Sequence, residues 1–373
     1  MQRIYLDANA TTPLDPRVRD AMAPWVDCGN ASSLHAEGRA ARDAIDRARD
    51  RVAALIGAQP REIVFTSGAT EANALALLGT LAARRCGRVL TSAVEHPSVL
   101  RTLEAIRGRI DLVVAPVRAD GCLSPDTEVP PDTGLVSIMR ANNETGAIMP
   151  VKEIATRARA AGAVVHTDAV QACGKIPVDV EDLAVDLLTV SAHKMHGPKG
   201  AGALYVRRGA RLDPLFFGGE HERGLRAGTE NVAAIVGLGV AAERAVEEGE
   251  ARRALWSRLY GLCVAELRAT LPDVTIHTPE TTLPNTICLT FPGVEGEAVL
   301  LGLDLEGIAV ATGSACSSGA AEPSHVLRAM GLTREEAERS IRISFHAQSC
   351  EPDVAACVTT LSRVVKRLRA LHA

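Results

Sequence analysis

Apolar segments of strand length alternate with longer amphipathic segments over residues 62–206, and this alternation constrains the fold more than any other feature of the chain. It is typical of a mostly parallel sheet whose faces are covered by helices. Helices are expected near Glu71–Ala83, Ser98–Arg107 and Lys152–Ala161. The sequence therefore predicts an α/β, doubly wound domain with a mostly parallel seven-stranded sheet. Its expected strands are Glu62–Thr66, Arg88–Ser92, Asp111–Pro116, Leu135–Met139, Ala163–Thr167, Leu187–Val190 and Gly202–Val206.

The pattern changes in the C-terminal part of the chain. After Thr229 an Ala- and Glu-rich helical stretch runs towards Leu271, and shorter strand-like and helix-like segments follow it. This change predicts a smaller α/β domain that is also joined by the N-terminal residues. We expect a large domain at 14–250 and a small domain made of 1–13 and 251–373. The shorter segments are Asn285–Phe291, Glu297–Leu303, Ser340–Phe345 and a last helix from about Pro352.

Composition excludes several kinds of partner. With 373 residues, 47% hydrophobic and 23% charged, the chain can bury two cores. A net charge of −4 and 3% aromatic residues argue against a nucleic-acid surface. No segment has the uninterrupted apolar length of a membrane span, and Met1–Asp7 lacks a signal pattern, so we expect no membrane partner and a cytoplasmic location. The nine cysteines lack zinc-type spacing, which indicates reduced thiols.

Two reactive side chains follow expected strands about one βαβ unit apart. Lys194 ends the segment Ser191–Lys194, and Asp168 lies in His166–Gln171. A lysine in this place can form a Schiff base, and a neighbouring aspartate can hold a pyridine nitrogen protonated. A lysine that ends an apolar strand is also better explained by chemistry than by packing, because desolvating an isolated ammonium group is costly. The pair indicates a pyridoxal phosphate site.

Three further segments follow expected strands, and each has two interpretations. Thr66–Asn73 opens a helix, so its backbone N–H groups and the Thr70 hydroxyl could hold a phosphate, or Ser67 or Thr70 could simply cap the helix. His96 could stack over a flat cofactor and exchange protons, or it could be a turn residue before a proline. Asn142–Gly146 could donate an amide hydrogen bond or form an ordinary turn.

Two other features invite a chemical interpretation. His193 and His196 are three residues apart, but no nearby carboxylate or cysteine completes a ligand set, so no metal site is predicted.

Thr312–Gly319 is a stretch of small residues around Cys316. Such a loop would let the thiol move towards a substrate, whereas the alternative is an ordinary surface cysteine. An exposed unpaired thiol is a reactivity liability, which favours the functional interpretation.

These segments together resemble the cysteine desulfurase family of the NifS/IscS type. The resemblance extends over nearly the whole chain and implies an aspartate-aminotransferase-like fold within the class V aminotransferase group. The matching segments are Tyr5–Pro13, Thr66–Asn73, Glu95-His96, Asn142–Gly146, His166–Gln171, Ser191–Gly200, Arg223–Thr229, Gly313–Gly319 and Glu322–Leu327.

The resemblance implies a role for each cofactor residue. Lys194 would hold pyridoxal 5'-phosphate, and His96 would stack on its ring. Asp168 would pair with the pyridine nitrogen and Gln171 with the phenolic oxygen. In the family, the threonine matching Thr229 reaches the cofactor phosphate of the other subunit, which implies a homodimer. The phosphate side would be held by Ala69, Thr70, Ser191 and His193.

The resemblance also implies a substrate and a reaction. Asn143 and Arg342 would bind the carboxylate of L-cysteine, for which the planar guanidinium is suited. Lys194 would move the α-proton, and Cys316 would accept the sulfur as a persulfide while L-alanine forms. His96 would carry the proton of the substrate thiol. Cys316 would then hand the sulfur to an acceptor protein such as an iron–sulfur scaffold.

The resemblance is less complete after the substrate arginine, where Phe345–Cys350 departs from the family's usual sequence. This departure leaves the acceptor protein and the local geometry open, but not the reaction. Two alternatives to this function also stay open. A selenocysteine lyase or another pyridoxal phosphate enzyme of this fold would not need Cys316. A non-catalytic sulfur carrier would keep the fold without the bound cofactor. Apart from a transient role of Cys316 as an iron–sulfur ligand, no metal interaction is expected.

Overall fold

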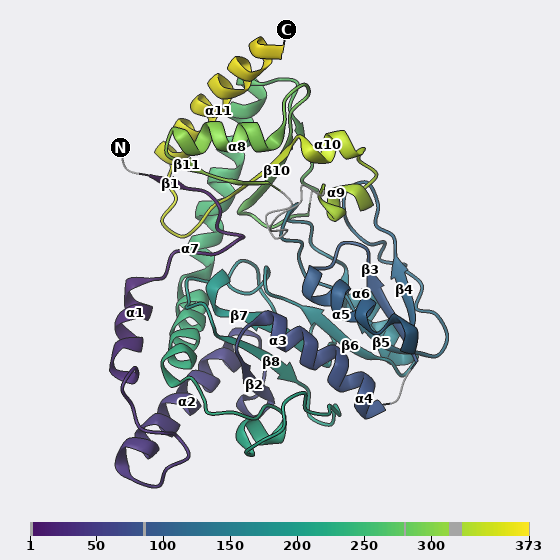
Figure 1. The fold of residues 1–373 in the computed structure, drawn as a ribbon, viewed down its shortest axis with the longest axis vertical. Coiled ribbons are helices and arrows are strands. Elements are labelled where there is room, and N and C mark those ends of the chain that lie inside the picture. The colour runs from purple at the N-terminus through teal and green to yellow at the C-terminus, as the bar shows by residue number, and fades with distance from the viewer. Residues whose placement is uncertain (1–2, 85–86, 280, 313–322, 373) are drawn as a thin grey trace.

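The computed structural model describes residues 3–84, 87–279, 281–312 and 323–372. A seven-stranded sheet in the order β2-β8-β7-β6-β5-β3-β4 forms its centre (Figure 1). The pairs from β7 to β4 are parallel, whereas β8 runs antiparallel to both of its neighbours. The α/β fold prediction is thus confirmed, with all the expected strands present. They are β2 (Ile63–Thr66), β3 (Arg88–Ser92), β4 (Asp111–Ala115), β5 (Thr133–Ser137), β6 (Val164–Asp168), β7 (Leu187–Ser191) and β8 (Gly202–Val206).

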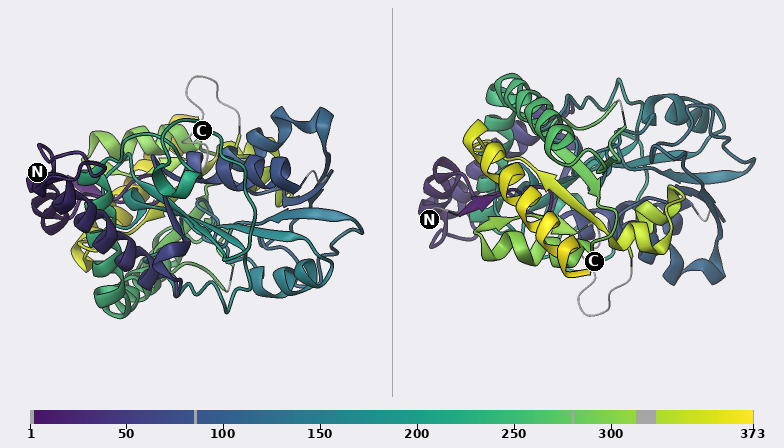
Figure 2. Two further views of the ribbon diagram at one scale, coloured as in Figure 1. Left: turned by 90° about the horizontal axis from the view of Figure 1, so that it is seen from below. Right: turned by 90° about the horizontal axis from the view of Figure 1, so that it is seen from above.

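Helices cover both faces of this sheet (Figure 2). Side chains alternate between the two faces of a strand, so Leu187 packs with the α3 and α5 side, while Leu188 and Val190 join the core under α2, α6 and α7. Because both faces are buried, the strands are almost continuously apolar. The helices around the sheet are α1 (Pro16–Met22), α2 (Ala36–Leu55), α3 (Ala69–Ala74), α4 (Thr80–Arg84), α5 (Pro97–Ala105) and α6 (Val151–Ala160).

Helix α7 (Val232–Thr270) joins the two parts of the molecule. Its first half packs tightly on α2, since a Cβ on Gly239 would lie only 2.6 Å from the Cα of Ala48. Its second half contributes Trp256 and Leu259 to a separate core. One helix of 39 residues therefore belongs to both cores.

The second core lies between helices and a four-stranded antiparallel sheet in the order β12-β13-β10-β9. Leu6 belongs to this core, and β1 pairs in parallel with β11, so the N-terminal residues join the C-terminal part. The boundaries proposed from the sequence, at residues 13 and 250, stay a prediction. The elements are β1 (Ile4–Tyr5), β9 (Thr275–Ile276), β10 (Thr286–Thr290), α8 (Gly296–Leu305), β11 (Ile308–Ala309), β12 (Ala311–Thr312), α9 (His325–Ala329), α10 (Arg334–Glu338), β13 (Ser340–Ser344) and α11 (Glu351–His372).

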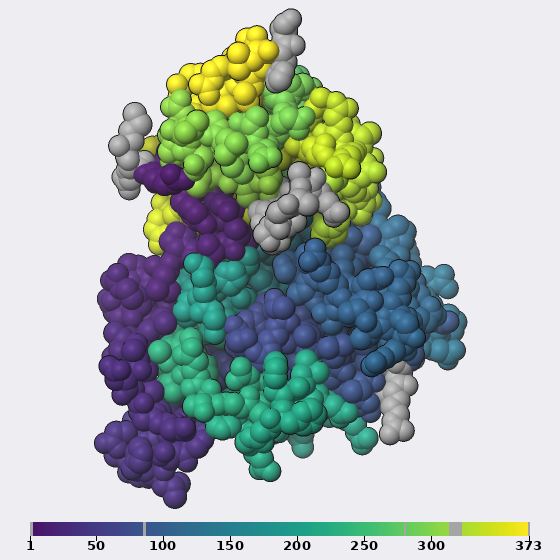
Figure 3. Space-filling model, viewed as in Figure 1, coloured from purple at the N-terminus to yellow at the C-terminus, as the bar shows by residue number. Residues whose placement is uncertain are grey.

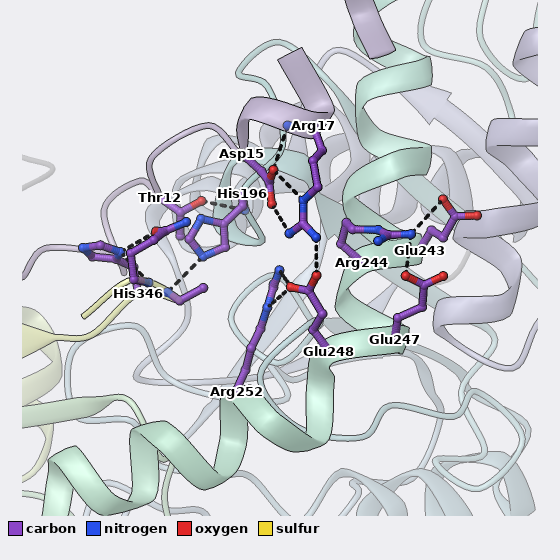
Figure 4. A network of polar contacts seen from close by, with 12 residues as sticks. Thr12, Asp15, Arg17, His196, Glu243, Arg244, Glu247, Glu248, Arg252 and His346 are labelled. Atoms are coloured by element: carbon purple, nitrogen blue, oxygen red, sulfur yellow. Dashed lines mark hydrogen bonds and ion pairs between the residues drawn. The ribbon is translucent and has the colours of Figure 1, made fainter. Parts of the chain in front are cut away.

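The N-terminal segment, purple in Figure 3, runs along one side of the molecule from the lower part to the upper part. A chain of ion pairs fixes it to α7 (Figure 4). The Asp15 carboxylate pairs with Arg17, Arg17 pairs with Glu248, and Glu248 also pairs with Arg252 at 2.7 Å. Among the described helices, none has the length and apolar surface that crossing a membrane would require.

His196 lies at the same junction and serves as a structural link. Its Nδ1 is 2.9 Å from the carbonyl of Pro13, and its Nε2 accepts a hydrogen bond from the backbone N–H of Ala347. Its ring meets that of His346 edge-on (Figure 4). Burial lowers the pKa of His196 to about 4, so the ring is neutral and can accept one bond while donating the other.

His166 should make the fold sensitive to acid. It is fully buried in β6 between the hydroxyls of Ser137 and Thr189, and desolvation lowers its pKa to about 4. In the unfolded chain His166 takes up a proton near pH 6.5, whereas in the folded protein it does so only near pH 4. The stabilisation that the neutral buried ring provides is therefore complete above pH 6.5 and is lost as the pH falls towards 4. We expect a loss of about 2 kcal/mol between pH 7 and 5. Urea unfolding of the wild type and of His166→Gln should show a shallower pH dependence in the variant, and identical slopes would contradict this expectation.

Candidate active site

The carboxyl ends of parallel strands meet at one edge of the sheet, and the segments that follow them enclose a cavity of about 600 Å³. The far wall comes from the N-terminal segment and β13. Ten of the candidate residues line this cavity: Ala69, Thr70, His96, Asn143, Asp168, Gln171, Ser191, His193, Lys194 and Arg342.

Two candidate residues are placed differently. Thr229 is exposed and is not part of the cavity wall, so a role for it within its own subunit finds no support in this arrangement. Cys316 lies outside the described residues.

Asp168, at the end of β6, is held by two donors. Its Oδ2 accepts a hydrogen bond of 2.7 Å from the side-chain amide of Asn73, and its Oδ1 accepts one of 3.0 Å from the backbone N–H of Val170. The side chain is only 6% exposed yet lines the cavity. A buried carboxylate with fixed oxygens can hold a protonated ring nitrogen in place.

The His96 ring is fixed by a hydrogen-bond relay that begins at the same asparagine. Asn73 donates to the Ser98 hydroxyl at 2.9 Å, and that hydroxyl lies 2.8 Å from His96 Nδ1, which also accepts from the Ser98 backbone N–H. Nδ1 is therefore an acceptor, and the neutral ring carries its proton on Nε2. Burial lowers the pKa of His96 further than Asp168 raises it, so the imidazole is neutral at pH 7.

Lys194 closes the short turn that follows β7. Its Nζ donates to the backbone carbonyls of Asn9 and Ala10, at 2.6 and 2.8 Å. These carbonyls belong to the N-terminal segment, which thereby directs the amine.

Arg342 lies on β13, opposite the large sheet, and is 3% exposed. One guanidinium nitrogen donates to the carbonyl of Asn143 at 2.8 Å, and the other to the carboxylate of Asp7 at 2.7 Å. Its Nε has no hydrogen-bond partner within the described residues. Arg342 lines the cavity, and a planar guanidinium on a cavity wall is suited to an incoming carboxylate.

The opposite end of the cavity is formed by residues 67–70 at the start of α3. This loop lies directly on β8, because a Cβ on Gly202 would come within 2.7 Å of the Gly68 carbonyl carbon. Burial, together with the Lys194 and Lys199 cations, lowers the pKa of His193, which lines the same cavity, to about 4. No cluster of metal-ligating side chains is found across the described ranges.

The residues present fit pyridoxal phosphate, the group that the sequence resemblance implies. The cavity volume is typical of a small-molecule site, and the cavity presents an amine, a carboxylate and an imidazole from the carboxyl ends of β7, β6 and β3. Backbone N–H groups at the start of a helix are suited to the phosphate.

Two buried residues of the site were not recognised in the sequence. The side-chain amide of Asn9 donates to the Asn143 carbonyl and to the Thr286 hydroxyl. The Nζ of Lys175 donates to the side-chain carbonyl of Gln171. Asn9 lay within a matching motif but had no assigned role. The four-residue spacing of Gln171 and Lys175 was the available signal that these two side chains meet.

Comparison with known proteins establishes the family. The family model Aminotransferase class-V matches residues 4–357, so the chain belongs to this family. It is 43% identical to the cysteine desulfurase IscS of Dictyoglomus turgidum, over 99% of this chain and 96% of the relative. A solved NifS-like protein has a TM-score of 0.92 and 37% identity, covering 98% of this chain and 100% of its own. A structure of SspA in complex with cysteine has a TM-score of 0.81 and 35% identity, covering 92% and 98%.

Proposed function

We propose that this protein is a pyridoxal phosphate-dependent cysteine desulfurase, which converts L-cysteine to L-alanine and transfers the sulfur to Cys316 as a persulfide. The observation that carries the proposal is the meeting of Lys194, Asp168, His96 and Arg342 around one cavity. The relatives named as cysteine desulfurases, and the solved relative in complex with cysteine, support the same substrate.

When bound, pyridoxal phosphate supplies an electron sink that makes the substrate's α-proton acidic and weakens its carbon–sulfur bond. The Arg342 guanidinium binds the substrate carboxylate, assisted by Asn143. The Lys194 amine, directed by the carbonyls of Asn9 and Ala10, takes the α-proton. His96 accepts the proton of the substrate thiol and is available to do so because its ring is neutral.

Sulfur transfer then takes place between two sulfur atoms. The Cys316 thiolate forms a bond to the substrate sulfur while the carbon–sulfur bond breaks, and the electron pair of that bond stays with the substrate carbon. Protonation of this carbon gives the methyl group of alanine. The persulfide on Cys316 is the product that an acceptor protein collects, and we infer an iron–sulfur scaffold and a cytoplasmic setting.

The proposal includes a homodimer in which Thr229 of each subunit reaches the other subunit's cofactor phosphate. The exposure of Thr229 supports this role, as do large apolar side chains nearby. Leu34 is 89% and Phe217 87% exposed. Arg42 of α2, the helix that follows Leu34, pairs with Glu230 at 3.3 Å, and a Cβ on Gly218 would lie 3.1 Å from the Cβ of Ala227. Burying such side chains against a second copy would be favourable.

A Cys316→Ala variant tests the proposed function. We expect its rate of alanine and sulfide formation from L-cysteine, with reductant present, to fall by about 10²- to 10³-fold, because the attacking sulfur is removed. The bound cofactor's visible band should persist, since the cavity residues are unchanged.

The matched control is Cys350→Ala, which removes an exposed cysteine and should leave the rate unchanged. Undiminished turnover in Cys316→Ala would exclude the persulfide step and favour a selenocysteine lyase type of reaction. A wild-type protein that binds no pyridoxal phosphate would overturn the enzyme assignment itself.

A further inference from the structure

Lys175 is a buried lysine that the proposed reaction does not use. It lies in the turn after β6 and is 2% exposed. Its Nζ donates to the side-chain carbonyl of Asn9 at 2.7 Å and to the side-chain carbonyl of Gln171. Both acceptors are uncharged amides, and within the described part of the chain Lys175 forms no ion pair.

The surroundings of Lys175 destabilise its charged form. Burial, Lys194 and Arg342 all disfavour its charged form and hold its pKa well below the usual value. A buried amine without a carboxylate partner destabilises a fold. Its presence therefore indicates that its hydrogen bonds have a role in the site. Filling the same space with an apolar side chain would avoid this cost, so packing does not explain the lysine.

The hydrogen bonds of Nζ suggest its role. Nζ donates to both side-chain amides, so each amide turns its oxygen towards Nζ. The amide nitrogen of Gln171 then points the other way, where it donates to the backbone carbonyl of Asn9 at 2.9 Å. Because Gln171 lines the cavity, its orientation decides whether a bound ring meets an N–H donor or a carbonyl acceptor.

The same bond fixes Asn9, whose backbone directs Lys194. With its oxygen held by Lys175, the Asn9 side chain donates to the carbonyl of Asn143 at 3.1 Å and to Thr286 at 2.9 Å. The Asn9 backbone carbonyl accepts from Lys194 Nζ at 2.6 Å. One amine thereby connects the cofactor face of the cavity with the segment that directs the Schiff-base lysine.

We propose that Lys175 is a positioning residue that fixes the side-chain amides of Gln171 and Asn9, so that Gln171 presents its remaining N–H donor to the cofactor and Asn9 holds its backbone carbonyl against Lys194. This inference rests on the proposed function, because it assigns how the same cavity holds pyridoxal phosphate.

A double-mutant cycle tests the proposal through cofactor binding alone, without cysteine. The variants are Lys175→Met, Gln171→Leu and the double variant, with Lys152→Met, at an exposed lysine, as control. The measurements are the dissociation constant of pyridoxal phosphate for the cofactor-free protein and the wavelength of the bound cofactor's visible band. Thermal unfolding of each cofactor-free protein reports whether the fold is intact.

We expect Lys175→Met to weaken cofactor binding by about tenfold and to shift the visible band. The double variant should lose less affinity than the product of the two single effects, because Lys175 acts in part through Gln171. The control should match the wild type. Independent effects that multiply, or a Lys175→Met protein with unaltered affinity and band, would overturn the proposal.

Two further outcomes are also decisive. If Lys175→Met does not fold, Lys175→Gln takes its place in the same cycle, since its amide keeps one donor and should give a smaller effect in the same direction. If the wild type binds no pyridoxal phosphate, the proposed function and this inference both fail. If the wild type binds it and the cycle shows no coupling, only the role of Lys175 is overturned.

Discussion

A Lys194→Ala variant is expected to form alanine from L-cysteine at least about 10⁴-fold more slowly than the wild type. The side chain is assigned two tasks, the covalent attachment of the cofactor and the removal of the α-proton, and both require an amine. Its position depends on hydrogen bonds to the carbonyls of Asn9 and Ala10, which a different side chain would not form. The measurement is alanine formation with pyridoxal phosphate in excess, together with the visible spectrum of the protein.

Circular dichroism should show an intact fold in this variant, since the amine is only partly buried. The matched control is Lys152→Ala, where an exposed lysine on α6 pairs with Asp182. Surface pairs of this kind contribute little, so its rate should equal that of the wild type. A Lys194→Ala rate within about tenfold of the wild type would show that the amine is dispensable.

The strands of the central sheet could be predicted because, apart from the edge strand β4, both of their faces are buried. Each forms a short, almost continuous apolar run, and the observed bounds of Arg88–Ser92 and Gly202–Val206 equal the predicted ones. The long helix was predicted as a stretch from Thr229 towards Leu271 and is observed at Val232–Thr270. The pattern that predicts each of these elements lies within the element's own residues.

The arrangement of the strands carried no such local signal. β8 follows β7 in the chain but enters the sheet antiparallel, between β7 and β2. The two-residue strands β9 and β12 are too short for any periodicity to be recognised. Helix α2 was not predicted, although its Ala-rich face packs on α7. Strand order and helix docking depend on packing between distant segments, which one sequence does not display.

Much of the site was predictable because reactive side chains gather at strand ends. Lys194, Asp168 and His96 each follow a strand, and the parallel arrangement brings those ends together. Asn9 was not recognised because its contacts are with distant residues, and the four-residue spacing of Lys175 from Gln171 did not reveal the contact of Lys175 with Asn9. The bond from Lys175 to Asn9 spans 166 residues of sequence.

An Asp168→Asn variant should lower turnover of L-cysteine by about 10³-fold while leaving cofactor affinity within about tenfold of the wild type. The amide has nearly the shape of the carboxylate, so the cavity should keep its volume. It carries no charge, however, and cannot hold the cofactor's ring nitrogen protonated, which weakens the electron sink. The measurements are kcat for alanine formation and the dissociation constant of pyridoxal phosphate.

Two comparisons separate the charge of Asp168 from its shape. Asn73→Ala keeps the carboxylate but removes the hydrogen bond of 2.7 Å that orients it, so its loss of turnover should be smaller, at about tenfold. Asp182→Asn changes an exposed carboxylate and should have no effect. If Asp168→Asn kept most of its activity, the negative charge would be unnecessary and Asp168 would act only as a hydrogen-bond acceptor. If Asn73→Ala lost as much activity as Asp168→Asn, the two orientations that Asn73 fixes, that of the Asp168 carboxylate and that of His96 through Ser98, would together matter as much as the charge.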